Sequence, residues 1–456
     1  MVRQVSANDS IVAAATPIGE SAIAVIRVSG ALCQKLCKDA LRVPYPIPRR
    51  STLAGYLDVN ECLIDEVIFV FYEEQNSYTS EPSLEISSHG NPFITKKIIE
   101  DLVSRGCRLA EPGEYTKRAF LSGRMDLTQA ESVATLIKAS SERALEVARI
   151  QLRGDLGKKI SDLQSRLLNL QANLEAYIDF PEEDLPSEDI KGPSDALANL
   201  IAEVEHLSQS AGCAHLLEAG IRCLIVGSPN AGKSSLYNLL CGEERAIVSD
   251  ESGTTRDYLS SRIDVGPFMV EMMDTAGLCT GGSKVERLGI ERTLQLSEEA
   301  DCFLFVVDST LPSPESVSKD LSNNINAENC LVLENKIDLK DSKDLNDFLP
   351  DFQHLRLSIE TGEGINDCRT AIKEMMGKII PPPSEEYMIV NARHAANLAL
   401  VGNFLREAHR LLLEGLSIEL SILEITSGIG ALGEIVGKTN NEDMLDRLFH
   451  SFCIGK

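Results

Sequence analysis

The chain has 456 residues, of which 43% are hydrophobic and 25% are charged, a composition that is ordinary for globular proteins. Its 44 lysines and arginines against 69 aspartates and glutamates give a formal net charge of −25, which excludes a protein that coats nucleic acid over its whole surface. No stretch reaches the roughly 18 apolar residues of a membrane-spanning helix, and no apolar run follows the N-terminus, so we expect a cytoplasmic protein with no membrane partner.

The cysteines are scattered along the chain and form no Cys-x-x-Cys pair. Most of them lie in apolar runs, as Cys223, Cys302 and Cys330 do. We interpret them as reduced thiols buried in hydrophobic cores.

The first part of the chain, residues 1–122, combines strand and helix patterns. Apolar and β-branched runs predict strands at 23–28, 67–72 and 84–86, and a helical period predicts a helix at 96–103. These patterns predict a mixed α+β domain.

Helical patterns surround a central region that alternates between strands and helices. Apolar residues three and four apart predict one long helix: Leu156, Ile160, Leu163, Leu167, Leu170, Leu174 and Ile178. Apolar runs then predict strands at 221–226, 268–273, 302–307 and 330–333, and helical periodicity returns after Pro381-Pro382-Pro383. We therefore expect three domains: residues 1–122, a helical domain of 123–214 plus 381–456, and a domain of 215–380 inserted into it.

The segment Gly227-Ser228-Pro229-Asn230-Ala231-Gly232-Lys233-Ser234 follows the pattern of a phosphate-binding loop. A predicted strand enters it, and a predicted helix that includes Ser235 leaves it. Backbone N–H groups of such a loop surround phosphate oxygens at a helix N-terminus. Lys233 would pair with the β- and γ-phosphates, and Ser234 would bind Mg²⁺.

Two further motifs follow in order. Asp274-Thr275-Ala276-Gly277 comes at the end of the next clear strand, where the aspartate can hold Mg²⁺ through water and Gly277 can donate to a γ-phosphate. Asn335-Lys336-Ile337-Asp338 follows the strand at 330–333. The carboxylate of Asp338 can accept from both N1–H and the amino group of guanine, and adenine lacks that donor pair. Alone, such a tetrapeptide is as often a surface turn; as the third motif in order, it predicts guanine specificity.

Two other segments complete the expected nucleotide site. Thr255 or Thr254 could join the Mg²⁺ shell when a γ-phosphate is bound. Ser358 begins a turn that is a candidate contact to the base. Leu278 stands where signalling GTPases place a water-orienting glutamine, so hydrolysis needs another polar group and another positive charge.

Asn230, the segment 253–257 and Leu278 together resemble the tRNA-modification GTPases of the MnmE (TrmE) family. The resemblance continues in segments 111–120 and 126–131 and in the terminal Cys453-Ile454-Gly455-Lys456. It implies a multidomain α/β fold with an N-terminal α+β folate-binding-like domain, a helical bundle domain and an inserted Ras-like P-loop GTPase domain.

The resemblance also implies how GTP is hydrolysed. In this family K⁺ and dimerisation of the GTPase domains activate the reaction, and K⁺ supplies the charge of an arginine finger. The K⁺ ligands would come from four residues: Asn230, Ser249, Glu251 and Thr254. Glu286 matches the glutamate that helps to position the attacking water; without the resemblance it would be taken as an exposed charge.

The N-terminal domain of the family binds a tetrahydrofolate derivative, 5-formyl- or 5,10-methylene-, and forms a homodimer. The residues that match its contacts are Arg27, Glu85, Arg124 and Lys456. Cys453 would lie near this site, either as a catalytic thiol or as a small C-terminal packing residue.

The family acts on the wobble uridine, U34, of tRNA. With an FAD-dependent partner, MnmG, in a heterotetramer, it adds a carboxymethylaminomethyl group at C5, and the folate supplies the one-carbon unit. Lys117-Arg118 and Lys158-Lys159 are candidate basic contacts to tRNA, although solvated surface charge is the simpler interpretation of each. The alternative function is a GTP-dependent ribosome or RNA assembly factor that uses the GTPase only as a switch.

Overall fold

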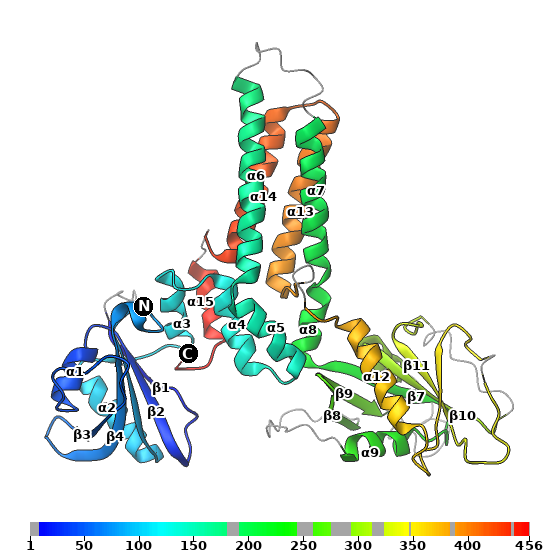
Figure 1. The fold of residues 1–456 in the computed structure, drawn as a ribbon, viewed down its shortest axis with the longest axis horizontal. Coiled ribbons are helices and arrows are strands. Elements are labelled where there is room, and N and C mark those ends of the chain that lie inside the picture. The colour runs from blue at the N-terminus through cyan, green and yellow to red at the C-terminus, as the bar shows by residue number, and fades with distance from the viewer. Residues whose placement is uncertain are drawn as a thin grey trace. The chain divides into compact units, whose positions relative to one another are not determined.

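A computed structural model describes residues 9–179, 191–243, 259–274, 293–311, 323–345, 348–383, 388–438 and 442–455. The chain divides into two compact units. The first comprises residues 1–134, 151–169 and 429–456, and the second comprises residues 135–150 and 170–428. Figure 1 shows the elements of both units.

The first unit contains a 6-stranded sheet with the order β3-β4-β5-β2-β1-β6. Its strands are β1 (Ile11–Ala14), β2 (Ser21–Ser29), β3 (Thr52–Leu57), β4 (Leu63–Tyr72), β5 (Ser83–Gly90) and β6 (Arg108–Leu109). All neighbours are antiparallel except β1 and β6. Helices α1 (Cys33–Asp39) and α2 (Pro92–Ser104) bury apolar residues against one face. The predicted strands and helix are confirmed.

Three helices of the first unit contribute to a small aromatic core: α3 (Glu114–Leu121), the start of α4 (Leu127–Lys138) and α15 (Glu442–His450). The start of α6 (Asp155–Asp179) belongs to the same unit. Phe120 and Leu127 meet Phe449 and Phe452 of the C-terminal segment in this core. A short 3-10 helix, η1 (Glu74–Asn76), follows β4.

Within the second unit, α7 (Lys191–Gln209) packs along α13 (Ala392–Leu413), and Ser194 Oγ lies 3.0 Å from His409 Nε2. Most of α5 (Glu142–Leu152), α8 (Ala211–Ala219) and the first part of α14 (Ile418–Val436) also belong to this unit. The long helix predicted from the apolar period is α6, and its Leu163, Leu167 and Leu174 are fully buried. Among the described residues, no helix is both long enough and apolar enough to cross a membrane.

The second unit also contains a 6-stranded sheet with the order β12-β11-β10-β7-β9-β8. Its strands are β7 (Ile221–Gly227), β8 (Leu259–Val265), β9 (Phe268–Asp274), β10 (Cys302–Asp308), β11 (Cys330–Asn335) and β12 (Gln353–Arg356). All strands are parallel except β8. Helices α9 (Lys233–Glu243) and α12 (Ile365–Ile379) pack on one face, and a second apolar cluster covers the other. The four predicted strands are confirmed.

The described cysteines are buried except Cys62 and Cys453. Burial raises the pKa of the Cys330 and Cys368 thiols to about 12, so both stay protonated and unreactive near neutral pH. The interpretation of the cysteines as buried thiols is therefore confirmed for most of them.

The two compact units divide the chain at positions other than the predicted domain boundaries, and the boundaries of the three domains stay a prediction. Helix α5 explains part of the difference. Its Ala144 and Val147 are buried in the same cluster as Ile221 of β7, and the backbone N–H of Arg143 donates to Pro267 O over 2.9 Å. A segment assigned to the helical domain thus packs directly on the second sheet.

Candidate functional site

The loop between β7 and α9 has the backbone of a phosphate cradle. Gly227 has φ +141°, and a Cβ there would lie 2.1 Å from Val306 O. Gly232 has φ +109°, and a Cβ there would lie 2.3 Å from Asn335 Nδ2. Only glycine fits either position, so the two glycines let the loop close tightly at the end of β7.

Helix α9 begins at Lys233, which places a positive helix end and its N–H groups at the loop. The Lys233 side chain is 9% exposed and its Nζ donates to Gly227 O and Ser228 O, both over 2.8 Å. Ser234 and Ser235 are exposed in the first turn of the helix, and Ala231 is buried. The charge, the hydroxyls and the helix end are those that bind phosphate and Mg²⁺.

Asn230 takes the left-handed conformation, with φ +63°, and is exposed. Asparagine tolerates this conformation better than most residues. Asn230 is therefore accessible at the surface of the loop, as a cation ligand would need to be.

Asp274 ends β9 and is 1% exposed. It pairs in register with Ile225 of β7, two residues before the loop. Several predicted site residues lie outside the described residues: Ser249, Glu251, Thr254, Thr255, Thr275, Ala276, Gly277, Glu286 and Lys456. Their roles stay predictions.

The predicted guanine motif meets the phosphate loop directly. Asn335 is 4% exposed, and its Nδ2 donates to Ala231 O over 2.8 Å. Its Oδ1 accepts from the backbone N–H of Ile359 over 3.2 Å. One amide thus joins the phosphate loop to the turn that begins at Ser358.

The other residues of the motif are arranged around this amide. Lys336, with φ +68°, forms an ion pair with Asp308 at the end of β10. Burial raises the pKa of Asp308, but hydrogen bonds from Lys336 and Thr310 lower it more, so the pKa falls below its ordinary value. Asp338 is exposed, as a carboxylate that meets a base must be.

Ser358 is fully buried and organises its own turn. Its Oγ accepts from Thr361 N over 3.2 Å, and its N–H donates to Glu363 O over 2.9 Å. Because β7, β10 and β11 are parallel, the phosphate loop, Asp308 and the guanine motif all lie at their carboxyl edge. Asp308 was not among the predicted site residues, although an aspartate at the end of a buried strand is a signal visible in the sequence.

In the first unit, the structure brings Arg27 and Glu85 together. Arg27 Nη2 donates to Glu85 Oε1 over 2.8 Å, and Nη1 donates to Gly455 O over 3.2 Å. The Tyr72 hydroxyl donates to Glu85 Oε2 over 3.3 Å, and the Arg27 guanidinium lies 5.8 Å from the Tyr115 ring centroid. The C-terminal segment thus reaches this ion pair through Gly455 O.

Cys453 stands two residues before Gly455, whose carbonyl accepts from Arg27. Burial raises the pKa of the Tyr78 hydroxyl, and the hydrogen bond with Thr116 and the charges of Arg27 and Arg124 lower it by less. Cys453 is exposed in this chain, and both interpretations of it, as a catalytic thiol and as a C-terminal packing residue, stay predictions. Its carbonyl accepts from Gly113 N over 3.4 Å. The Arg27 guanidinium could also pair with a carboxylate-bearing ligand such as a folate.

The predicted basic contact at Lys117-Arg118 is wrong for Arg118. Its side chain is 10% exposed and pairs with Glu81 and Glu114, both over 2.9 Å. Lys117 forms an ion pair with Asp446. The Arg118 guanidinium is held by two carboxylates, because a charge that is nearly buried must be paired. It is therefore neither a phosphate contact nor a solvated surface charge.

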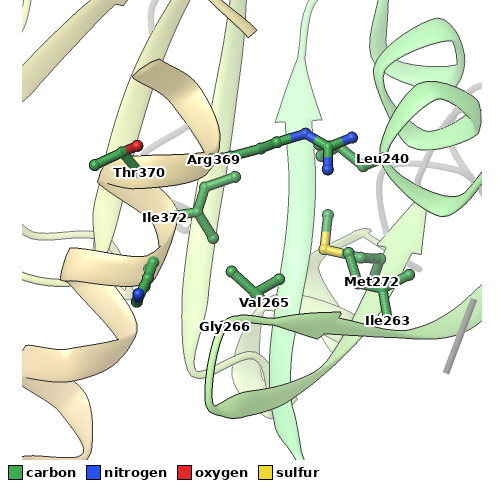
Figure 2. A pocket seen from close by; sticks show the side chains of 9 residues that line it. Leu240, Ile263, Val265, Gly266, Met272, Arg369, Thr370 and Ile372 are labelled. Atoms are coloured by element: carbon green, nitrogen blue, oxygen red, sulfur yellow. The ribbon is translucent and has the colours of Figure 1, made fainter. Parts of the chain in front are cut away.

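A cavity of about 150 Å³ lies between α12 and the hairpin of β8 and β9 (Figure 2). Figure 2 shows Arg369 extending from α12 toward Leu240 of α9. Val265 and Gly266, at the turn end of the hairpin, line the cavity, whereas Asp274 is at the other end of β9. The cavity is therefore separate from the phosphate loop. Within the described ranges, no cluster of three or more His, Cys, Asp or Glu side chains could hold a metal ion.

Two family models match the chain. One, described as the GTP-binding protein TrmE N-terminus, matches residues 10–124, and the other, described as the MnmE helical domain, matches residues 127–453. The tRNA modification GTPase MnmE of Opitutus terrae is 42% identical over 450 residues, which cover 98% of this chain and 99% of that protein. The chain belongs to the MnmE family.

The MnmE of Aquifex aeolicus is 39% identical over 454 residues, which cover 98% of this chain and all of that protein. The solved G domain of T. maritima FeoB matches 34% of this chain and 98% of its own length, at 24% identity and a TM-score of 0.26. As a member of the MnmE family, the chain is a GTPase, and the family acts in tRNA modification. The predicted fold class, with an N-terminal α+β part, a helical part and a P-loop GTPase part, is confirmed.

Proposed function

We propose that this chain hydrolyses GTP with K⁺ as activator, and that it uses this cycle to modify the wobble uridine of tRNA. The observation that carries the proposal is the hydrogen bond from Asn335 to Ala231. It joins the guanine motif to the phosphate loop, so one nucleotide can be held by its base and its phosphates at the same time.

Each residue of the proposed nucleotide site would have its own role. Lys233 would bind the β- and γ-phosphates, Asp338 would select guanine, and Glu286 would orient the attacking water. Ser234 and Thr255 would hold Mg²⁺. Asn230, with Ser249, Glu251 and Thr254, would hold K⁺, which when bound supplies positive charge where the transition state becomes more negative.

GTP turnover is expected to be at least about tenfold faster in K⁺ than in Na⁺ at equal ionic strength, because a fixed cation against the phosphates is worth several kilocalories. The variant that tests the K⁺ ligand most directly is Asn230→Gly, because glycine keeps the left-handed backbone and removes only the side-chain amide. It should lose the K⁺ advantage and keep GDP affinity. Phosphate release assays in each salt measure the rates, and titration with GDP is the control. Equal rates in K⁺ and Na⁺ for the unmodified protein would refute K⁺ activation.

We further propose that Arg27, Glu85, Arg124 and Lys456 bind 5-formyl- or 5,10-methylene-tetrahydrofolate, with Cys453 close by. The pairing of Arg27 with both Glu85 and Gly455 O supports this site. The product would be a carboxymethylaminomethyl group at C5 of U34, made in the cytoplasm by a homodimer of this chain in a heterotetramer with FAD-dependent MnmG. The full-length similarity to MnmE proteins favours this over an assembly factor.

Arg27→Ala is expected to weaken 5-formyl-tetrahydrofolate binding by roughly tenfold or more, because a charge-assisted hydrogen bond is lost and Glu85 loses its partner. Arg42→Ala removes an exposed pair with Glu61 in the same unit and is the matched control. Isothermal titration calorimetry measures both affinities. An Arg27→Ala protein that binds the folate as the Arg42→Ala protein does would place the folate elsewhere.

A further inference from the structure

Glu334 is a fully buried carboxylate in a strand that is otherwise apolar up to this point. It stands immediately before Asn335, the first residue of the guanine motif. Burying an unpaired charge destabilises a fold, so the partners of Glu334 indicate its role.

The partners of Glu334 come from β12. His354 Nδ1 lies 2.8 Å from Glu334 Oε1, and Arg356 Nε lies 3.6 Å from Glu334 Oε2. The register pairs Glu334 with Arg356 and Val332 with His354, so these side chains share one face of the sheet. In the described part of the chain, Oε2 is buried and has no hydrogen-bond partner.

The second nitrogen of His354 helps to define the pair. His354 Nε2 lies 3.2 Å from Leu349 O, and because a carbonyl only accepts, this nitrogen donates. His354 thus contacts Leu349 O through one ring nitrogen and Glu334 Oε1 through the other. The contact with Glu334 holds β11 to β12 by side chains as well as by backbone bonds.

This pair lies where two recognition segments leave the sheet. β11 leads into Asn335–Asp338, and β12 leads into the turn at Ser358. Leu357 N donates to Glu334 O over 2.9 Å, and Ile337 N donates to Leu357 O over 3.4 Å. The distance between the two strands at Glu334 therefore sets the distance between the two segments that would hold the base.

We propose that Glu334 is a positioning residue for guanine recognition. Its pair with His354 and Arg356 holds the segment with Asp338 at a defined distance from the turn at Ser358. The inference rests on the proposed contact between Asp338 and the base. Replacing a buried ion pair by apolar residues is often neutral for stability. We therefore assign the charged side chains to positioning the two segments rather than to stabilising the fold.

The test compares GDP with IDP, whose base lacks the 2-amino group that Asp338 would accept from. Glu334→Gln keeps the shape and removes the charge. It is expected to lower the ratio of GDP to IDP affinity by about fivefold, while the GDP affinity falls about tenfold. The control is Val332→Ala, two residues earlier on the same face, which should lower the unfolding midpoint and leave the ratio within about twofold of the unmodified protein.

Titration calorimetry gives both affinities, and thermal unfolding gives the stability of each variant. If Glu334→Gln does not fold, the double variant Glu334→Leu with His354→Leu replaces the pair by apolar side chains and should show the same loss of ratio. An unchanged ratio in either folded variant overturns the proposal.

Asp338→Asn, measured in parallel, separates this inference from the proposed function. If Asp338→Asn removes the preference for GDP and Glu334→Gln does not, only the role of Glu334 is wrong. If Asp338→Asn leaves the preference for GDP over IDP intact, the assignment of the base site is wrong, and the proposed role of Glu334 is wrong as well.

Discussion

Lys233→Ala is expected to weaken GTP binding by roughly a hundredfold or more, because two charge-assisted hydrogen bonds to phosphate are lost together. Lys233 is the first residue of α9, and its Nζ already lies against Gly227 O and Ser228 O, so the cation is held at the loop rather than in solvent. Isothermal titration calorimetry with GTP and Mg²⁺ measures the loss.

Two controls accompany this variant. Lys340→Ala removes an exposed lysine of the same unit and should bind GTP normally. Thermal unfolding of Lys233→Ala checks that the loop still folds without the two bonds to its carbonyls. A folded Lys233→Ala protein with unchanged affinity for GTP would show that the phosphates bind elsewhere.

Asp338→Asn is expected to reverse base preference from GTP toward xanthosine triphosphate, with GTP binding weakened by roughly a hundredfold. The carboxylate offers two acceptors, which match N1–H and the amino group of guanine. An amide exchanges one acceptor for a donor, which matches the carbonyl oxygen that xanthine carries at that position. Competition binding between the two triphosphates measures the preference.

Asp341→Asn is the matched control, since Asp341 is an exposed aspartate three residues further along the same segment. It should leave the preference for GTP unchanged. If Asp338→Asn keeps that preference as well, the base is recognised by other residues, of which those in the turn at Ser358 are the next candidates.

The motifs and strands of the nucleotide site could be predicted because each depends on local chemistry. A glycine-rich loop between a strand and a helix is specified by a few adjacent residues, and the structure shows that Gly227 and Gly232 have no room for a side chain. The rule that parallel strands present their carboxyl ends at one edge then brings Asp308 and Asn335 to the same side as the loop.

Charged residues were harder to interpret from the sequence. Lys117-Arg118 was a candidate contact to tRNA, with solvated surface charge as the simpler interpretation, yet the Arg118 side chain is only 10% exposed and pairs with Glu81 and Glu114. Glu81 lies far from Arg118 in the sequence, so nothing local indicates the pair. The same holds for Glu334 and His354, which meet only because β11 and β12 are neighbours.

The amino-acid sequence by itself determined the kinds of element, the order of the nucleotide-binding motifs and the family, because each of these depends on residues close together in the chain. Only the tertiary structure decided which contacts distant residues make with one another. The bond from Asn335 to Ala231, the reach of Gly455 O to Arg27 and the pair of Glu334 with His354 all join separate segments. Their formation depends on strand register and burial, which arise when the whole chain packs, and no local pattern encodes them.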